Sequence, residues 1–235
     1  MMHSSQFRWW FVLALVAGSA FLQPASAADE MTRRMAACTS CHGREGQAAH
    51  SDYFPRLAGK PAAYLYEQLR SFRDGRREQA EMSHLLANLS DAYLREMAEY
   101  FASIELPYPP PVPSDLPDAQ LARGRALVFG GDEARGIPAC VRCHGEALTG
   151  ALPHTPSLLG LPRLYIASQL GAWVTGDRRA LAPDCMAEVG RKLNSEDIRA
   201  LAGWLAAQPM PAGARAAESL PRGLPLDCSA TEAHR

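Results

Sequence analysis

Two short cysteine motifs with the same spacing carry the clearest chemistry in the sequence. The first contains Cys38, Cys41 and His42, and the second contains Cys140, Cys143 and His144. Two thiols one helical turn apart can each add to a vinyl group of haem, and the histidine that follows can then bind the iron. The pattern predicts two covalently bound c-type haems in this chain.

Three other readings of these cysteines fit less well. A thioredoxin-like redox pair needs a βαβ pattern around it, and the sequence shows none. A zinc site could combine two Cys-x-x-Cys pairs, but Cys38 and Cys140 lie 102 residues apart and each pair has its own histidine. Plain disulfides leave the two histidines unexplained.

The haem motifs belong to a longer internal repeat, which is the sign of a duplicated domain. The segment Pro55-x-Leu57-x-Gly59-x-Pro61 recurs as Pro156-x-Leu158-x-Gly160-x-Pro162, and Tyr64 and Gln68 recur as Tyr165 and Gln169. A proline-rich stretch separates the copies and predicts an extended connector. We therefore expect domains at 28–106 and 119–213, a linker at 107–118 and a tail at 214–235.

Met82 and Met186 are the predicted second axial ligands. They follow His42 by 40 residues and His144 by 42, and they are repeat-equivalent. Each is expected in a stretch between helices, and a neutral thioether ligand raises the haem potential. The alternative is that both methionines only fill the core. Rival histidine ligands would give a low-potential haem, but none has a repeat partner: His50, His84 and His154.

The elements that must position these residues are helices. Apolar spacing predicts helices at 61–73, 118–128 and 161–173, and further helices capped by Ser90 and by Asn194 or Ser195. No convincing alternating strand occurs, so the expected fold class is all-α. Four arginines on and after the 61–73 helix are expected to form a solvated face, and contact with a partner or a haem propionate is the alternative: Arg70, Arg73, Arg76 and Arg77.

The net charge limits the class of partner, and the N-terminal residues indicate where the protein is located. With 24 Lys and Arg against 25 Asp and Glu, the chain lacks the basic face of a nucleic-acid binder. Residues 1–27 combine Arg8, an apolar run from Phe11 to Leu22 and a small-x-small cleavage site ending at Ala27. They predict export to the periplasm, and an uncleaved membrane anchor is the alternative.

The two motifs, the paired PxLxG segments and the two methionines resemble the dihaem cytochrome c4 family over nearly the whole mature chain. The resemblance implies two class I cytochrome c domains related by approximate twofold symmetry. It also implies a soluble or peripherally membrane-attached periplasmic carrier between a dehydrogenase or quinol-oxidising complex and a terminal oxidase. In such domains the carbonyl groups of Pro55 and Pro156 would receive the second nitrogen of each axial histidine. We expect a monomer.

Cys185 and Cys228 depart from the plainest form of that family. Cys185 directly precedes Met186, and Cys228 lies in the tail. With four cysteines assigned to haem, these two are expected to form a disulfide in an oxidising compartment, and two free thiols are the alternative. Closing 43 residues contributes about 4 kcal/mol in the chain-entropy model.

A haem with both axial positions filled by protein has no open site for a substrate. Such a haem passes one electron at a time, so the prediction is an electron carrier and not a catalyst. One alternative is a dihaem peroxidase, which needs a displaceable ligand and an acid/base group, and His84 near Met82 is the only hint of one. The other is a dedicated subunit of a dehydrogenase complex.

Overall fold

The computed structural model describes residues 27–48, 52–220 and 223–228. The chain divides into two compact units, Met1–Arg34 and Met35–Arg235. In the first unit only helix α1 (Ala27–Arg34) is described, and there Glu30 pairs with Arg33 and Arg34. Residues 1–26 of the expected export signal lie outside the described residues. Among the described helices, none has the length and apolar character needed to cross a membrane.

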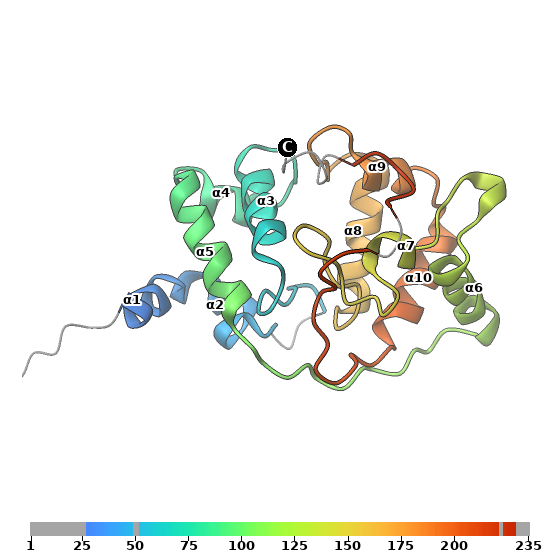
Figure 1. Ribbon diagram of the computed structural model, residues 1–235, viewed down its shortest axis with the longest axis horizontal. Coiled ribbons are helices and arrows are strands. Elements are labelled where there is room, and N and C mark those ends of the chain that lie inside the picture. Colours follow the sequence, from blue (N-terminus) through green and yellow to red (C-terminus); the bar gives the residue numbers. More distant parts are fainter. Residues whose placement is uncertain (1–26, 49–51, 221–222, 229–235) are drawn as a thin grey trace, which may run out of the picture. The chain divides into compact units, whose positions relative to one another are not determined.

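The N-terminal half of the second unit is built on two packed helices (Figure 1). Helix α3 (Ala62–Arg73) packs against α5 (Asp91–Ser103) and α4 (Ala80–Leu86). Helix α5 starts at the predicted cap, where the Ser90 hydroxyl accepts a hydrogen bond from Tyr93 N at 3.2 Å. Two shorter elements precede them: α2 (Ala36–His42) and η1 (Arg44–Gly46). The buried apolar face of α5 carries Leu94, Met97 and Phe101.

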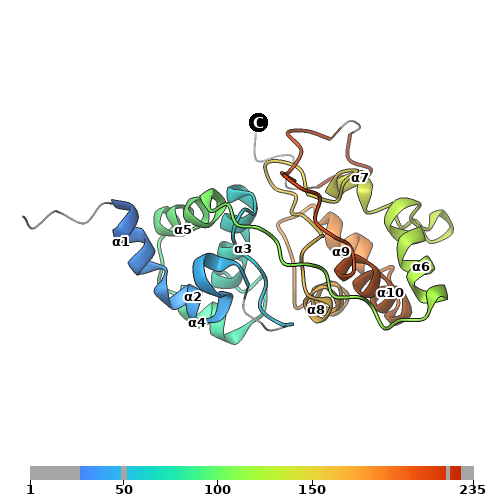
Figure 2. The same cartoon turned by 90° about the horizontal axis from the view of Figure 1, so that it is seen from below.

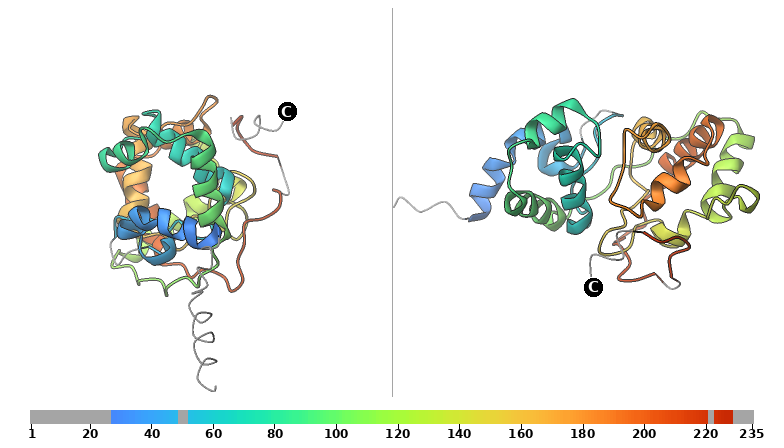
Figure 3. Two further views of the ribbon diagram at one scale, coloured as in Figure 1. Left: turned by 90° about the vertical axis from the view of Figure 1, so that its left-hand side faces the viewer. Right: turned by 90° about the horizontal axis from the view of Figure 1, so that it is seen from above.

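The C-terminal half repeats this arrangement and has one further long helix at its start. Helix α10 (Ser195–Ala206) packs against both α6 (Asp118–Phe129) and α8 (Arg163–Thr175), as Figure 3 shows. Three shorter helices complete the half: η2 (Glu133–Arg135), α7 (Val141–His144) and α9 (Cys185–Gly190). The core between them includes Leu127, Val128, Leu201 and Leu205.

A buried carboxylate fixes the start of α10. Asn194 caps the helix and forms a capping box with Asp197, which is 2% exposed. Asp197 also accepts hydrogen bonds from Arg123 of α6 at 3.1 Å and from Arg135 at 2.7 Å. Charge-assisted hydrogen bonds of this kind are stronger than neutral ones, so they tie α6 and the loop after it to α10.

The all-α expectation is confirmed for the described residues, in which isolated bridges occur but no named strand. The expected helices lie within two residues of their predicted ends. The two methionine stretches differ from expectation, because Met82 lies on α4 and Met186 on α9. Helix α9 forms because the Asp184 side chain accepts from Ala187 N at 3.0 Å.

The linker after α5 is extended and held along its length (Figure 2). Arg56 is 3% exposed and donates to the carbonyls of Leu106 at 2.6 Å and Pro107 at 3.1 Å. Its guanidinium also lies 4.1 Å from the centre of the Tyr108 ring. Tyr108 in turn covers Gly160, where a Cβ would overlap the ring. The domain boundaries at 106 and 119 stay predictions.

Candidate haem sites

Each Cys-x-x-Cys-His motif forms a short helix that ends on its histidine. Helix α2 ends at His42 and α7 at His144, and the glycine that follows has a φ of 78° at Gly43 and 82° at Gly145. L-residues rarely adopt this backbone conformation, so glycine lets the chain turn away directly after the histidine. The two motifs therefore share one local backbone.

The two histidine rings are oriented in the same way. His42 Nδ1 lies 2.9 Å from Pro55 O, and His144 Nδ1 lies 2.9 Å from Pro156 O. A carbonyl can only accept, so each Nδ1 must donate and each Nε2 keeps its lone pair. This is the tautomer and orientation that a metal-binding imidazole needs, and it is the contact expected from the family resemblance.

Burial keeps both imidazoles neutral. Burial lowers the pKa of His42, and the charge of Arg77 lowers it further against the opposing hydrogen bond to Pro55. Burial likewise lowers the pKa of His144, and the charges of Arg178 and Lys60 add to that effect. Neutral imidazole is the form that binds iron.

The four motif cysteines are not engaged in disulfides. Burial raises the pKa of Cys38 and Cys143, and it raises the pKa of Cys140 to about 11. These thiols are therefore mostly protonated at neutral pH and are poor spontaneous nucleophiles. The shielded environment of Cys38, Cys140 and Cys143 fits a thioether better than a reactive redox pair, whereas Cys41 is exposed.

Met82 and Met186 lie on equivalent short helices, each fixed against a longer one. Next to Met82, the Ser83 hydroxyl donates to Phe72 O of α3 at 3.1 Å. On α9, a Cβ at Gly190 would lie 2.6 Å from the Cβ of Trp173 on α8. Met97 is 4% exposed in the core of the N-terminal half, as expected of a packing residue. Iron ligation by Met82 and Met186 stays a prediction.

The disulfide between Cys185 and Cys228 is present in the structure, with 5.2 Å between the two Cα atoms. The tail is held at a second place, where Ala217 N donates to Gly150 O at 2.9 Å and Leu152 N donates to Ala217 O at 2.8 Å. The tail is thus fastened both to the residue before Met186 and to the loop that follows His144.

The rival histidines differ in their surroundings. His84 is exposed on α4, and His154 is half-buried in the loop before Pro156. His50 lies outside the described residues. Among the described residues, no group of three or more His, Cys, Asp or Glu side chains gathers in a metal-binding arrangement.

Arg77 and Arg178 form the centre of a contact between the two halves that sequence reasoning missed. They face each other in an isolated antiparallel bridge. The neighbouring backbone exchanges two hydrogen bonds of 2.7 Å, from Glu78 N to Asp177 O and from Arg179 N to Arg76 O. The expectation that Arg77 lies on a solvated face is wrong, because its side chain is closed in by the other half and is only 7% exposed.

The side chains of these two arginines follow the same twofold pattern. Each reaches a glutamine in its own half and a glutamine and a tyrosine in the other. Arg77 donates to Gln68 at 2.9 Å, Tyr165 at 3.0 Å and Gln169 at 2.6 Å. Arg178 donates to Gln169 at 3.0 Å, Gln68 at 2.9 Å and Tyr64 at 3.5 Å. Burial, followed by the charge of Arg77, lowers the pKa of Arg178.

Lys60 is a third buried cation near this contact. It is 4% exposed, and its Nζ lies 3.5 Å from Ser157 O in the other half. Burial, helped by the charge of Arg56, lowers the pKa of Lys60 to about 7. The sequence repeat could have pointed to the buried arginines, because Arg77 and Arg178 occupy equivalent positions. It gives no such indication for Lys60.

The buried cations fit a cofactor that carries carboxylates. Within the described part of the chain, Lys60, Arg77 and Arg178 make no ion pair with an aspartate or glutamate. Haem brings two carboxylates, and buried charges are normally paired. The oriented histidines, the protonated cysteines and the unpaired cations together match the chemical needs of covalently bound haem.

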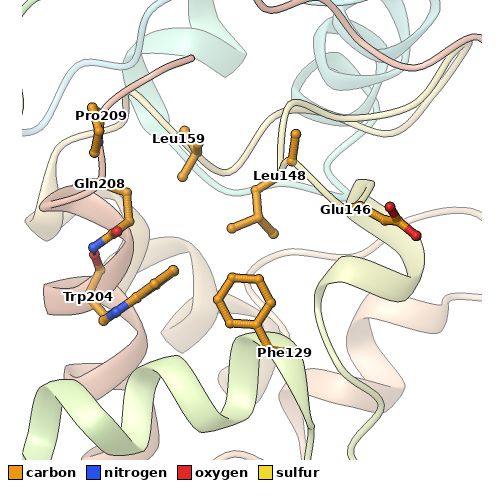
Figure 4. A pocket seen from close by; sticks show the side chains of 8 residues that line it. Phe129, Glu146, Leu148, Leu159, Trp204, Gln208 and Pro209 are labelled. Carbon is orange, nitrogen blue, oxygen red and sulfur yellow. The ribbon is translucent and has the colours of Figure 1, made fainter.

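A small pocket of about 260 Å³ in the C-terminal half is a different feature (Figure 4). Phe129 and Trp204 meet edge to face across it, with ring centres 5.6 Å apart, and Leu148 and Leu159 face them. Neither the motif residues nor Met186 line this pocket. We assign it to the packing of α6 against α10.

The chain is similar to known cytochromes c. The family model for cytochrome c matches residues 32–123. A thiosulfate dehydrogenase electron acceptor from Thiomonas intermedia is 39% identical, covering 74% of this chain and 80% of the relative. Cytochrome c4 from Pseudomonas aeruginosa is 36% identical, covering 73% of this chain and 84% of the relative.

Two solved structures are also similar. Reduced cytochrome c4 from Pseudomonas stutzeri superposes with a TM-score of 0.66 at 32% identity, covering 78% of this chain and 99% of that one. Thiosulfate dehydrogenase from Marichromatium purpuratum gives a TM-score of 0.66 at 36% identity, with 76% of this chain and 38% of that chain covered. The fold and the paired sites define a c-type cytochrome, an electron carrier with covalently bound haem. Within that class, the chain belongs to the dihaem cytochrome c4 family.

Proposed function

We propose that this chain is a periplasmic dihaem cytochrome that carries electrons from a dehydrogenase or quinol-oxidising complex to a terminal oxidase. Cys38 and Cys41 attach the first haem, and Cys140 and Cys143 attach the second. The axial pairs are His42 with Met82 and His144 with Met186. The observation that carries this proposal is the matched pair of 2.9 Å contacts from each histidine Nδ1 to a proline carbonyl.

Bound haem supplies a reversible one-electron change at iron. The protein holds the imidazoles in one orientation through Pro55 and Pro156, which limits reorganisation when the charge on the site changes. Two filled axial positions leave no place for a substrate at either site, which favours a carrier over a peroxidase-like enzyme. The same framework in both halves also supports two sites with the same role.

The similarity to two thiosulfate dehydrogenase proteins favours a particular donor. One relative is named as an electron acceptor of that enzyme, and this chain matches 38% of the length of one solved thiosulfate dehydrogenase chain. We infer that a thiosulfate dehydrogenase is a donor to this cytochrome. The same similarity keeps open a stable complex with the enzyme as the second candidate.

Loss of either methionine is expected to change one haem only. Met82→Ala and Met186→Ala should each remove about half of the Met–iron charge-transfer absorbance and lower the potential of one haem, because the thioether favours Fe(II). Potentiometric titration with visible spectroscopy measures both effects. The core variant Met97→Leu should keep both bands. A full band in either alanine variant would show that another group binds that iron.

The donor assignment is tested with purified components. Thiosulfate and a thiosulfate dehydrogenase are mixed with the oxidised cytochrome, and reduction is followed in the haem absorbance. We expect both haems to become reduced in the complete mixture and neither without the enzyme. A cytochrome that stays oxidised while the enzyme reduces a small-molecule acceptor at full rate would exclude this donor. Co-elution of the two proteins would favour the stable complex.

A further inference from the structure

Lys60 breaks the twofold match between the two halves at the place where they meet. The prolines, the leucine and the glycine of Pro55–Pro61 recur in the second copy, whereas the positions between them differ, and there Arg56 corresponds to Ser157 and Lys60 to Leu161. The two interface arginines are equivalent and place the same charge in each half. Lys60 and Arg56 therefore each place a buried cation in the first half where the second copy of the repeat has an uncharged residue.

The position of this charge relates it to the second site. Lys60 Nζ contacts Ser157 O at 3.5 Å, and Ser157 directly follows the proline that orients His144. Lys60 belongs to the N-terminal half by sequence but reaches the histidine-orienting loop of the C-terminal half. That loop is the only acceptor found for it among the described residues, and one carbonyl does not neutralise an ammonium.

An ammonium that is 4% exposed is costly without an anion. Within the described chain, no carboxylate of Asp or Glu is paired with it, and the like charge of Arg56 lowers the pKa of Lys60 further. The described residues therefore supply no anion for Lys60. A haem carboxylate is the anion that the proposed function brings to this loop.

We propose that Lys60 supplies the positive charge for a haem carboxylate at the second site and thereby makes the second haem easier to reduce. This inference rests on the proposed function. Reduction lowers the charge at iron by one, so a nearby cation stabilises the reduced form relative to the oxidised form.

The test is a potentiometric titration of the holoprotein with Lys60→Met, which keeps an unbranched side chain but removes the charge. The two transitions are assigned to the two haems with Met82→Ala and Met186→Ala. At a fixed electrode potential, the ratio of reduced to oxidised second haem should fall on the order of tenfold, as expected for loss of one unit charge at short range. For a one-electron couple this is a shift of about 59 mV. The first haem should shift much less.

Lys60→Arg is the matched control, because it keeps the charge and should hold the second haem near its original potential. If Lys60→Met fails to mature with haem, Lys60→Gln carries the same test. Equal shifts of both haems, or none, would overturn the role of Lys60. A wild-type protein that lacks two haem transitions would instead overturn the proposed function, so the two failures are distinguishable.

Discussion

Changing Cys140 and Cys143 together to alanine is expected to yield a chain that carries one covalently bound haem instead of two. The thioether bonds require both motif thiols, and no other free cysteine lies in the described residues of the C-terminal half. The mass of the intact protein and the haem iron per chain measure the loss. The pair Cys38→Ala and Cys41→Ala should remove the other haem and leave the second in place.

A double variant at the disulfide controls for the removal of two cysteines. The double variant Cys185→Ala with Cys228→Ala also removes two cysteines, here those of the disulfide. It should keep two haems per chain, because neither residue belongs to a Cys-x-x-Cys-His motif. This variant should instead lower the free energy of unfolding, by at most about 4 kcal/mol in the chain-entropy model. If this control lost a haem, or if the Cys140/Cys143 variant kept two, the attachment assignment would be wrong.

The local parts of both sites could be predicted because short-range rules determine them. The spacing of Cys38, Cys41 and His42 specifies one turn of helix, and the structure ends α2 at that histidine. Ser90 is confirmed as a cap, and of the two candidates Asn194 and Ser195 the structure has Asn194, whose side chain accepts from the third residue beyond it. The Met82 and Met186 segments were placed correctly in the order of elements but were expected to be loops. Segments of six or seven residues give too little periodicity to separate a short helix from a turn.

The contact between the halves could not be predicted from either copy alone. A run of arginines after one helix is usually solvated, and nothing within that run shows that Arg77 is covered by Tyr165 and Gln169 from the other half. The equivalence of Arg77 and Arg178 signals a shared role, but burial depends on how two folded halves pack. Lys60 is harder still, because a mismatch with Leu161 resembles an ordinary surface substitution until its burial is known.

Gly124→Ala is expected to destabilise the C-terminal half by about 2–3 kcal/mol, because it forces two helices apart. Gly124 lies where α6 crosses α10, and a Cβ there would lie 2.8 Å from the carbonyl carbon of Ala200 and 2.8 Å from the Cβ of Trp204. Neither atom belongs to the flexible end of a side chain, so the backbones themselves must separate. Denaturant unfolding followed by haem absorbance and tryptophan fluorescence measures the change in the free energy of unfolding.

Gly171→Ala is the matched control on α8, where a Cβ meets no atom within 4 Å. Alanine is favoured over glycine inside a helix by up to about 1 kcal/mol, so this variant should be at least as stable as the parent. The same substitution should thus have opposite signs at two helical positions in one half. Two effects of the same sign would mean that helix propensity, and not the close approach of α6 to α10, determines the response. The opposite signs would show that the close crossing of α6 and α10 depends on a residue without a side chain.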